Sequence, residues 1–224
     1  MRTFPVQLFT GSIRPLPESG RPTGMFKSPC FSDIQFTFEG IIGDQQADRR
    51  VHGGPEKAVH LYPASHYRQL AGQFPETKVA LSPGTLGENL SVDGLDESHV
   101  HIGDIWQFGG VRLQLCQPRN PCWKIDERLG IDGVAEYIAK HYLTGWYWRV
   151  VQEGQASAGD WLSLQTRIPG NMSLLEAMKL WAEHRPDLHQ LEKLSRTEGI
   201  ASHWQRKIQQ RLDYLRLAQA HGKS

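Results

Sequence analysis

The segment QPRNPCWKI, residues 117–125, places a cysteine in a proline-rich turn beside fixed positive charge. Cys122 follows Pro121 directly, and the side chains of Arg119 and Lys124 are close to it in sequence. Nearby cations favour the thiolate over the thiol, and the thiolate is the form that attacks electrophiles and binds metals. A free cysteine is also often a small buried hydrophobic residue. The segment alone therefore leaves both roles open.

A second polar segment, GIIGDQQADRRVHGGPEKAVHLYP at residues 40–63, combines charged side chains with glycines. Glycines let the backbone approach a ligand closely, and backbone N–H groups with fixed cations can bind a phosphate or a similar anion. A solvated surface loop is the other interpretation, but the Gly-Gly pair has no obvious hairpin to justify it. We therefore favour an anion site and name as candidates Arg49, Arg50, His52, Gly53, Gly54 and Lys57.

A third segment, GTLGENLSVDG at residues 84–94, places Asn89 at the entrance of a short apolar strand between two turns. Its amide could donate to a bound heterocycle, or it could satisfy the backbone of the turn. Taken alone, the segment favours the turn.

Composition limits the class of protein. The chain has 224 residues, of which 39% are hydrophobic and 22% are charged, so it can bury a core. No apolar run approaches the roughly 18 residues of a membrane helix, and the N-terminus is too weak for a secretory signal, so we expect a cytoplasmic protein with no membrane partner. A net charge of +1 gives no general reason to expect nucleic-acid binding. Three cysteines in a chain without a secretory signal favour reduced thiols over disulfide bonds.

Short strand-like segments separated by glycines and prolines fill the chain as far as residue 169, which predicts a mainly β protein, a β-barrel with peripheral helices. Gly109-Gly110 is typical of a two-residue hairpin. Alternation along 111–116 places Cys116 on the more polar face of its strand. The expected strands are 5–10, 34–38, 58–62, 90–92, 105–108, 111–116, 146–152 and 161–165, and the expected helices are 64–72 and about 132–142.

Near residue 170 the sequence changes from short strand-like segments to helical patterns, which predicts two domains, 1–169 and 170–224. Ser173 and Glu176 fit a capping box that opens a first helix. A second helix is expected from Pro186-Asp187 and a third from about residue 202 to 219, where apolar residues recur at helical spacing. The second domain is therefore predicted to be a small three-helix bundle.

The polar segments, taken in order, resemble the MOSC domain family, which is named for the C-terminal domain of molybdenum-cofactor sulfurase. The matching phrases lie between residues 40 and 165 and are GDQQADRRVHGGPEKAVHLYP, GTLGENLSV, HIGD, QPRNPCWKI and GWYWRVVQEGQASAGDWL. The resemblance is strongest to bacterial members associated with resistance to 6-N-hydroxylaminopurine, in which a three-helix domain follows the MOSC barrel.

The resemblance implies a molybdenum cofactor, in which a phosphorylated pterin holds the metal through its dithiolene. Cys122 falls on the position of the family's cysteine ligand, and a soft thiolate suits such a metal. The pterin phosphate and ring are then expected at the residues of the second segment, from Arg49 to Lys57, together with Asn89 and Arg119.

By the same resemblance, the expected reaction reduces a small N-hydroxylated compound, such as 6-N-hydroxylaminopurine, to its amine. The sequence shows no flavin, haem or iron–sulfur motif, so the electrons are expected from a partner, and the resemblance implies an NADPH-dependent flavoprotein reductase as that donor. The alternative is a carrier that binds the cofactor or a persulfide at Cys122 without turning over such substrates.

Overall fold

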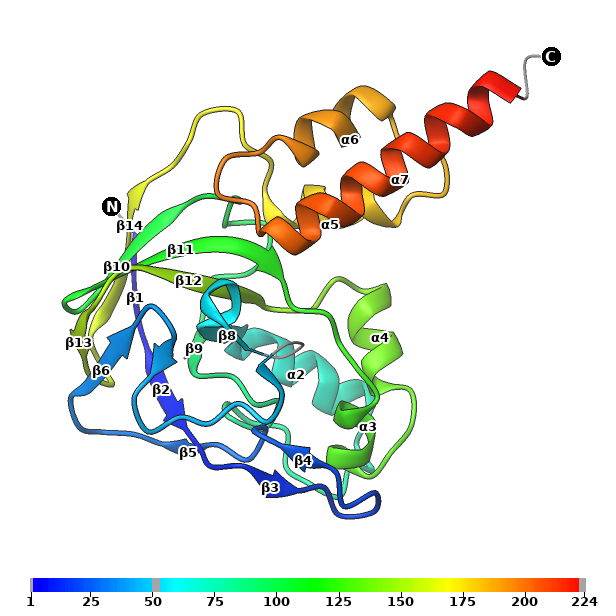
Figure 1. The fold of residues 1–224 in the computed structure, drawn as a ribbon. Coiled ribbons are helices and arrows are strands. Elements are labelled where there is room, and N and C mark those ends of the chain that lie inside the picture. Colours follow the sequence, from blue (N-terminus) through cyan, green and yellow to red (C-terminus); the bar gives the residue numbers. More distant parts are fainter. Residues whose placement is uncertain (1, 50–52, 222–224) are drawn as a thin grey trace.

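The computed structural model describes residues 2–49 and 53–221, which form a curled sheet with helices at two sides (Figure 1). Helices α5, α6 and α7 lie together beside β11 and β12, whereas α2, α3 and α4 lie at another edge of the sheet. Among the described residues no helix is both long and apolar enough to cross a membrane.

The main sheet has nine strands, and every neighbouring pair is antiparallel except β8 and β9. Its order is β1 (Thr3–Pro5), β14 (Trp161–Thr166), β10 (Ile105–Phe108), β11 (Val111–Pro118), β12 (Trp146–Gln152), β8 (Val59–Pro63), β9 (Leu90–Val92), β2 (Gln7–Thr10) and β5 (Ser28–Pro29). Smaller sheets join β13 (Gly154–Ala156), β6 (Ile34–Thr37) and β7 (Gly40–Ile41), and join β3 (Arg14–Pro15) to β4 (Pro22–Thr23).

The predicted closed barrel is corrected to a curled, open sheet. β1 and β2 are consecutive in the chain, yet β1 pairs with β14 at one end of the order and β2 pairs with β9 near the other. The chain therefore bends the sheet round on itself at Val6, but the ladder of the described strands does not close. The last strand, β5, is two residues long and contains Pro29, and a proline has no N–H with which to extend a ladder.

Strand β11 contains the main correction within an element. The predicted hairpin is confirmed, because Phe108 pairs with Val111 across the Gly-Gly turn. The pairing of β11 with β12 is irregular between Leu115 and Gln117, and this irregularity interrupts the alternation of faces. Cys116 is consequently fully buried in the core, and the prediction that it lies on a polar face is wrong.

The helices beside the main sheet share a second hydrophobic core with residues such as Leu70, Ile125 and Ile138. They are α2 (Ala64–Gln73), α3 (Lys124–Leu129) and α4 (Val134–Lys140), and a short 3-10 helix, η1 (Pro55–Lys57), precedes β8. Helix α3 was not expected from the sequence. It is only six residues long and ends at Gly130, whose φ is 69°.

The C-terminal helices are α5 (Leu174–Ala182), α6 (Leu188–Ser195) and α7 (Ser202–His221). The capping box of Ser173 and Glu176 is present at α5, and the Asp187 side chain caps α6. One continuous core contains both residues of the sheet and the buried face of α7. The boundary at residues 169/170 stays a prediction, because a shared core does not locate it.

Candidate functional site

Two adjoining cavities meet at Cys122. The larger has a volume of about 650 Å³ and lies between the sheet, the chain before α3 and the C-terminal helices. The smaller, about 80 Å³, is a polar recess beside it. Both cavities are lined by Lys57, Arg119, Asn120, Cys122 and Tyr147. The structure thus brings together three residues that the sequence predicted, Lys57, Arg119 and Cys122.

Arg119 is a buried cation on the wall that the cavities share. Its side chain follows the end of β11 and is only 6% exposed. The backbone N–H of Arg119 donates to the carbonyl of Gly145 (3.0 Å), and Nη2 donates to the carbonyl of Leu86 (3.2 Å). Nη1 is buried and has no hydrogen-bond partner among the described residues. A buried guanidinium with an unused donor fits an anionic ligand in the cavity.

The polar recess is built around a buried ion pair that the sequence analysis did not identify. Lys27 and Asp44 form this pair, and their side chains are 4% and 5% exposed. Asp44 Oδ2 accepts a hydrogen bond from Asn89 Nδ2 (2.9 Å), and Asn89 Oδ1 accepts one from the backbone N–H of His60 (3.1 Å). Asn89 lines the recess as predicted, but its amide is engaged in holding β8 and β9 to this pair. No sequence pattern links Lys27 to Asp44, because they meet only through the fold.

His60 is a buried neutral base in the recess. Burial and the charge of Arg119 hold the pKa of His60 well below its ordinary value. Its ring centre lies 5.1 Å from that of Tyr147, and its Nε2 atom has no hydrogen-bond partner within the described part of the chain. Burial raises the pKa of Tyr147, whereas the charge of Arg119 opposes the rise. Both rings therefore present neutral polar groups near the cation.

Lys57 reaches the shared wall because η1 turns the chain after the glycine pair. Gly54 has φ 85°, and a Cβ at Gly53 would lie 2.1 Å from Gln46 Oε1. These glycines permit a tight turn, and neither is among the residues that line the cavities. Burial and the charge of Lys207 lower the pKa of Lys57, and its Nζ lies 5.8 Å from the centre of the Tyr147 ring.

Of the remaining predicted residues of the second segment, the structure describes Arg49, which is not among the residues that line the cavities. Arg49 is exposed and pairs with Glu39. Arg50 and His52 lie outside the described residues. Their expected contacts with a cofactor stay predictions.

Cys122 is a half-buried free cysteine at the start of α3, where its carbonyl accepts a hydrogen bond from the N–H of Ile125 (3.0 Å). Lys124 donates to the carbonyl of Pro22 (3.0 Å), whereas Arg119 and Lys57 are cations that line both cavities together with the thiol. Within residues 2–49 and 53–221, no group of three His, Cys, Asp or Glu side chains could hold a metal ion.

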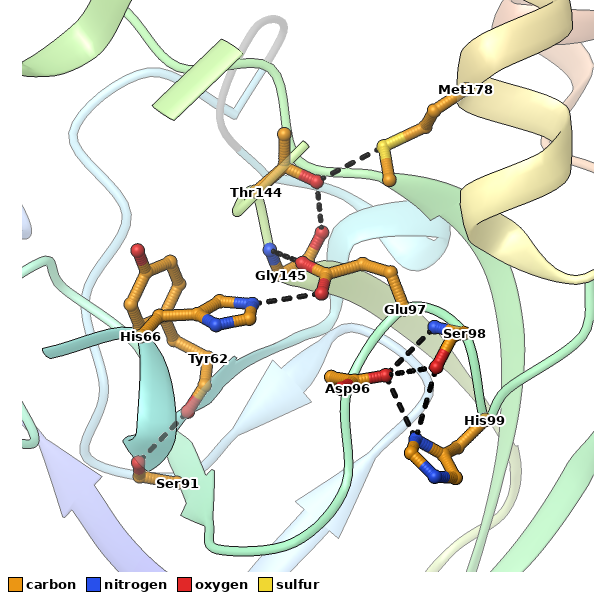
Figure 2. A network of polar contacts seen from close by, with 10 residues as sticks. All are labelled: Tyr62, His66, Ser91, Asp96, Glu97, Ser98, His99, Thr144, Gly145 and Met178. Atoms are coloured by element: carbon orange, nitrogen blue, oxygen red, sulfur yellow. Dashed lines mark hydrogen bonds and ion pairs between the residues drawn. The ribbon is translucent and has the colours of Figure 1, made fainter. Parts of the chain in front are cut away.

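Figure 2 shows a polar network in which Glu97 lies between His66 and Gly145. Glu97 accepts a hydrogen bond from the backbone N–H of Gly145 (2.7 Å), and its other oxygen lies 2.8 Å from His66 Nε2. The carbonyl of Gly145 is the group that binds the Arg119 backbone. Thr144 contacts the sulfur of Met178 in α5, and both residues line the larger cavity. The network therefore fixes the turn that supports Arg119.

A soft thiol, a buried cation with a free donor and neutral polar rings can together bind a polar, anionic cofactor and expose a reacting centre to the larger cavity. Comparison with known proteins bears on which cofactor that is.

The MOSC domain model matches residues 48–163. The chain is 36% identical to Protein YiiM of Escherichia coli over 209 residues, which cover 93% of this chain and 92% of that protein. The crystal structure of that Escherichia coli protein matches with a TM-score of 0.79 and 30% identity, and the match covers 95% of this chain and 93% of that one. A protein of Gibberella moniliformis named reductase is 32% identical over 142 residues, which are 63% of this chain and 25% of that protein. The chain therefore belongs to the MOSC domain family.

Proposed function

We propose that the protein is a molybdenum-cofactor-dependent reductase that converts N-hydroxylated compounds to amines. The observation that carries the proposal is the position of Cys122, which lies beside Arg119 at the junction of a polar recess and a larger cavity. Family membership and the similarity to a protein named reductase support a cofactor and a redox reaction.

The described residues fit such a cofactor. The buried Nη1 of Arg119 and the partly buried Lys57 suit the phosphate of the pterin, and the recess offers polar groups to its ring. Cys122 would ligate the metal, since a thiolate suits molybdenum that is already held by a dithiolene. We retain Arg49, Arg50, His52, Gly53 and Gly54 as proposed cofactor residues, with the glycines acting through the backbone turn.

The reaction that we propose is R–NHOH + 2 e⁻ + 2 H⁺ → R–NH₂ + H₂O. When bound, the cofactor supplies a centre that exchanges two electrons and accepts the hydroxyl oxygen. The chain holds the substrate against the thiol side of the cavity, and Tyr147 orients it there. An NADPH-dependent flavoprotein reductase is the proposed source of the electrons.

The test compares the wild type with Cys122→Ser, both expressed in a host that makes the molybdenum cofactor. Bound molybdenum is measured alongside reduction of 6-N-hydroxylaminopurine by reduced viologen. We expect metal and turnover in the wild type and loss of turnover in the variant, because an alcohol is a poor ligand for this metal. The matched control is Cys116→Ser, whose hydroxyl can keep the bonds that the Cys116 thiol donates to the carbonyls of Glu56 (3.0 Å) and Tyr147 (3.5 Å).

The possible outcomes separate the proposals. Normal turnover by Cys122→Ser would remove Cys122 from the mechanism. Molybdenum without turnover in the wild type would overturn the reductase proposal in favour of a carrier of the cofactor. No molybdenum in the wild type would overturn both.

A further inference from the structure

The larger cavity has an aromatic side that the smaller recess lacks. Trp181 comes from α5, Trp204 from α7 and Tyr142 from the segment after α4, and Met178 of α5 lines the same cavity. Trp204 is 7% exposed and packs in the hydrophobic core. It also lines the larger cavity. Flat aromatic rings and a thioether bind planar heterocycles by stacking and dispersion.

Tyr142 holds its place in this wall at a conformational cost. Its φ is 59°, the only positive φ of a residue other than glycine among the described residues. A left-handed conformation of a bulky residue costs about 1 kcal/mol or more, and such strain is concentrated at functional sites. The ring of Tyr142 lines the larger cavity, which fits a residue kept for what its side chain contacts.

Positively charged side chains also line the larger cavity. Lys207 and His203, one turn apart on α7, line it together with Lys57 and Arg119. No aspartate or glutamate is among the described residues that line this cavity. Lys207 is close enough that its charge lowers the pKa values of both Lys57 and His203, after the larger effect of burial on each, so His203 offers a neutral polar ring beside the lysines.

The carboxylate of Glu56, the residue before Lys57, is already engaged. Glu56 accepts hydrogen bonds from the N–H of Ser202 (2.8 and 3.0 Å) and from its hydroxyl (3.0 Å), and it pairs with Arg149 (2.9 Å). It therefore caps the start of α7, and its charge offsets only part of the effect of Lys207 on Lys57 and His203.

We infer that the larger cavity binds a nucleotide, with its heterocycle against the aromatic wall and its phosphate beside Lys207 and His203. The inference rests on the proposed function and specifies its substrate as an N-hydroxylated nucleoside monophosphate in preference to the free base. Lys207 and His203 line only the larger cavity, whereas Arg119 and Lys57 are shared with the recess. Lys207 thus serves the phosphate of the substrate, with His203 as a polar neighbour, whereas Arg119 and Lys57 serve the phosphate of the cofactor.

A binding experiment tests this inference without turnover. Quenching of tryptophan fluorescence is titrated with adenosine monophosphate, adenosine, adenine and inorganic phosphate, since Trp181 and Trp204 line the cavity. In the wild type we expect the monophosphate to bind about tenfold or more tightly than adenosine, because a charge-assisted contact with phosphate is added. In Lys207→Glu that preference should disappear while adenosine binding stays. The control Lys193→Glu makes the same change of charge at an exposed residue of α6 and should leave the preference intact.

Equal affinity of the wild type for adenosine and its monophosphate would overturn the inference. So would an unchanged preference in Lys207→Glu, or an equal loss in Lys193→Glu. Binding of inorganic phosphate as tightly as the monophosphate would also overturn it, because the aromatic wall would then contribute nothing.

Kinetics separate the inference from the proposed function. With reduced viologen, kcat/KM is measured for 6-N-hydroxylaminopurine and for its nucleoside monophosphate. A higher value for the monophosphate in the wild type, lost in Lys207→Glu, is the expected result. Turnover of the base with no gain for the monophosphate would overturn the inference and leave the reductase proposal standing. Turnover of neither compound would overturn the reductase proposal, and the fluorescence preference would then decide the nucleotide site alone.

Discussion

The buried pair of His66 and Glu97 offers a quantitative test of how the site is supported (Figure 2). Their side chains are 8% and 4% exposed, and 2.8 Å separates His66 Nε2 from Glu97 Oε2. Replacing His66 by alanine would leave the Glu97 carboxylate buried, with a hydrogen bond from the backbone N–H of Gly145. The removal of one partner from a buried pair typically costs about 3–5 kcal/mol, because the other charge stays in a medium that solvates it poorly.

We therefore expect His66→Ala to lower the free energy of unfolding by about 3–5 kcal/mol. The variant also loses the edge-on contact between the rings of His66 and Tyr62, whose centres are 5.5 Å apart. The matched control His66→Gln keeps an N–H donor near the position of Nε2 and should lose clearly less. A double-mutant cycle with Glu97→Ala should give a coupling energy of about 1–3 kcal/mol, since the two residues are in direct contact.

Urea unfolding followed by tryptophan fluorescence measures these energies, and an unchanged slope of the transition shows that the same unfolding event is compared. A loss below about 1 kcal/mol in His66→Ala, or a coupling energy near zero, would refute the reasoning. Either result would mean that water or a rearranged side chain replaces His66, and that the carboxylate does not depend on it to hold the turn at Gly145.

Two further predictions concern the same wall. Gly145→Ala should destabilise the protein by at least about 2 kcal/mol, because Gly145 has φ 65° and a Cβ there would lie 2.4 Å from the carbonyl oxygen of Leu61; wild-type stability in urea unfolding would contradict this. The pKa of His60 is lowered in the folded protein, so below pH 6.5 the unfolded chain binds a proton that the folded chain does not. The free energy of unfolding should therefore decrease as the pH is lowered from 6.5, by at most about 2 kcal/mol at pH 5. His60→Asn should lose that part of the pH dependence, and an unchanged pH profile of unfolding would show that His60 is not responsible.

Much of the fold could be predicted from local patterns. The strands β9, β10 and β12 have the bounds that alternation and turn residues predicted, and the capping box at Ser173 marks the start of α5 correctly. Whether the sheet closes into a barrel or stays open could not be predicted in the same way. It depends on which distant strands pair, and the two-residue strand β5 with its proline leaves almost no signal in the sequence.

Part of the candidate site could likewise be predicted from local patterns, and part could not. Cys122 and Arg119 could be found because prolines and charge mark their turn, and the structure places both on the shared wall. Lys27 and Asp44 could not be found, because neither residue is unusual in its own segment and their pairing joins two loops. The irregularity in β11 was also hidden, since a bulge is set by the partner strand, and it moved Cys116 from the expected polar face into the core.

The short helix η1 explains why the C-terminal helices belong to the candidate site. Glu56 points to α7, where it accepts the N–H of Ser202, and the next residue, Lys57, lines both cavities. The helix η1 is only three residues long, and it carries both the contact of Glu56 with α7 and the cavity side chain of Lys57. A shift of α7 against the sheet would therefore move Lys57 in the cavity wall. The helices also supply Trp181, Trp204 and Lys207 to the larger cavity. A boundary at residues 169/170 would therefore run through this cavity, so recognition of the substrate and the packing of the helices against the sheet depend on the same contacts.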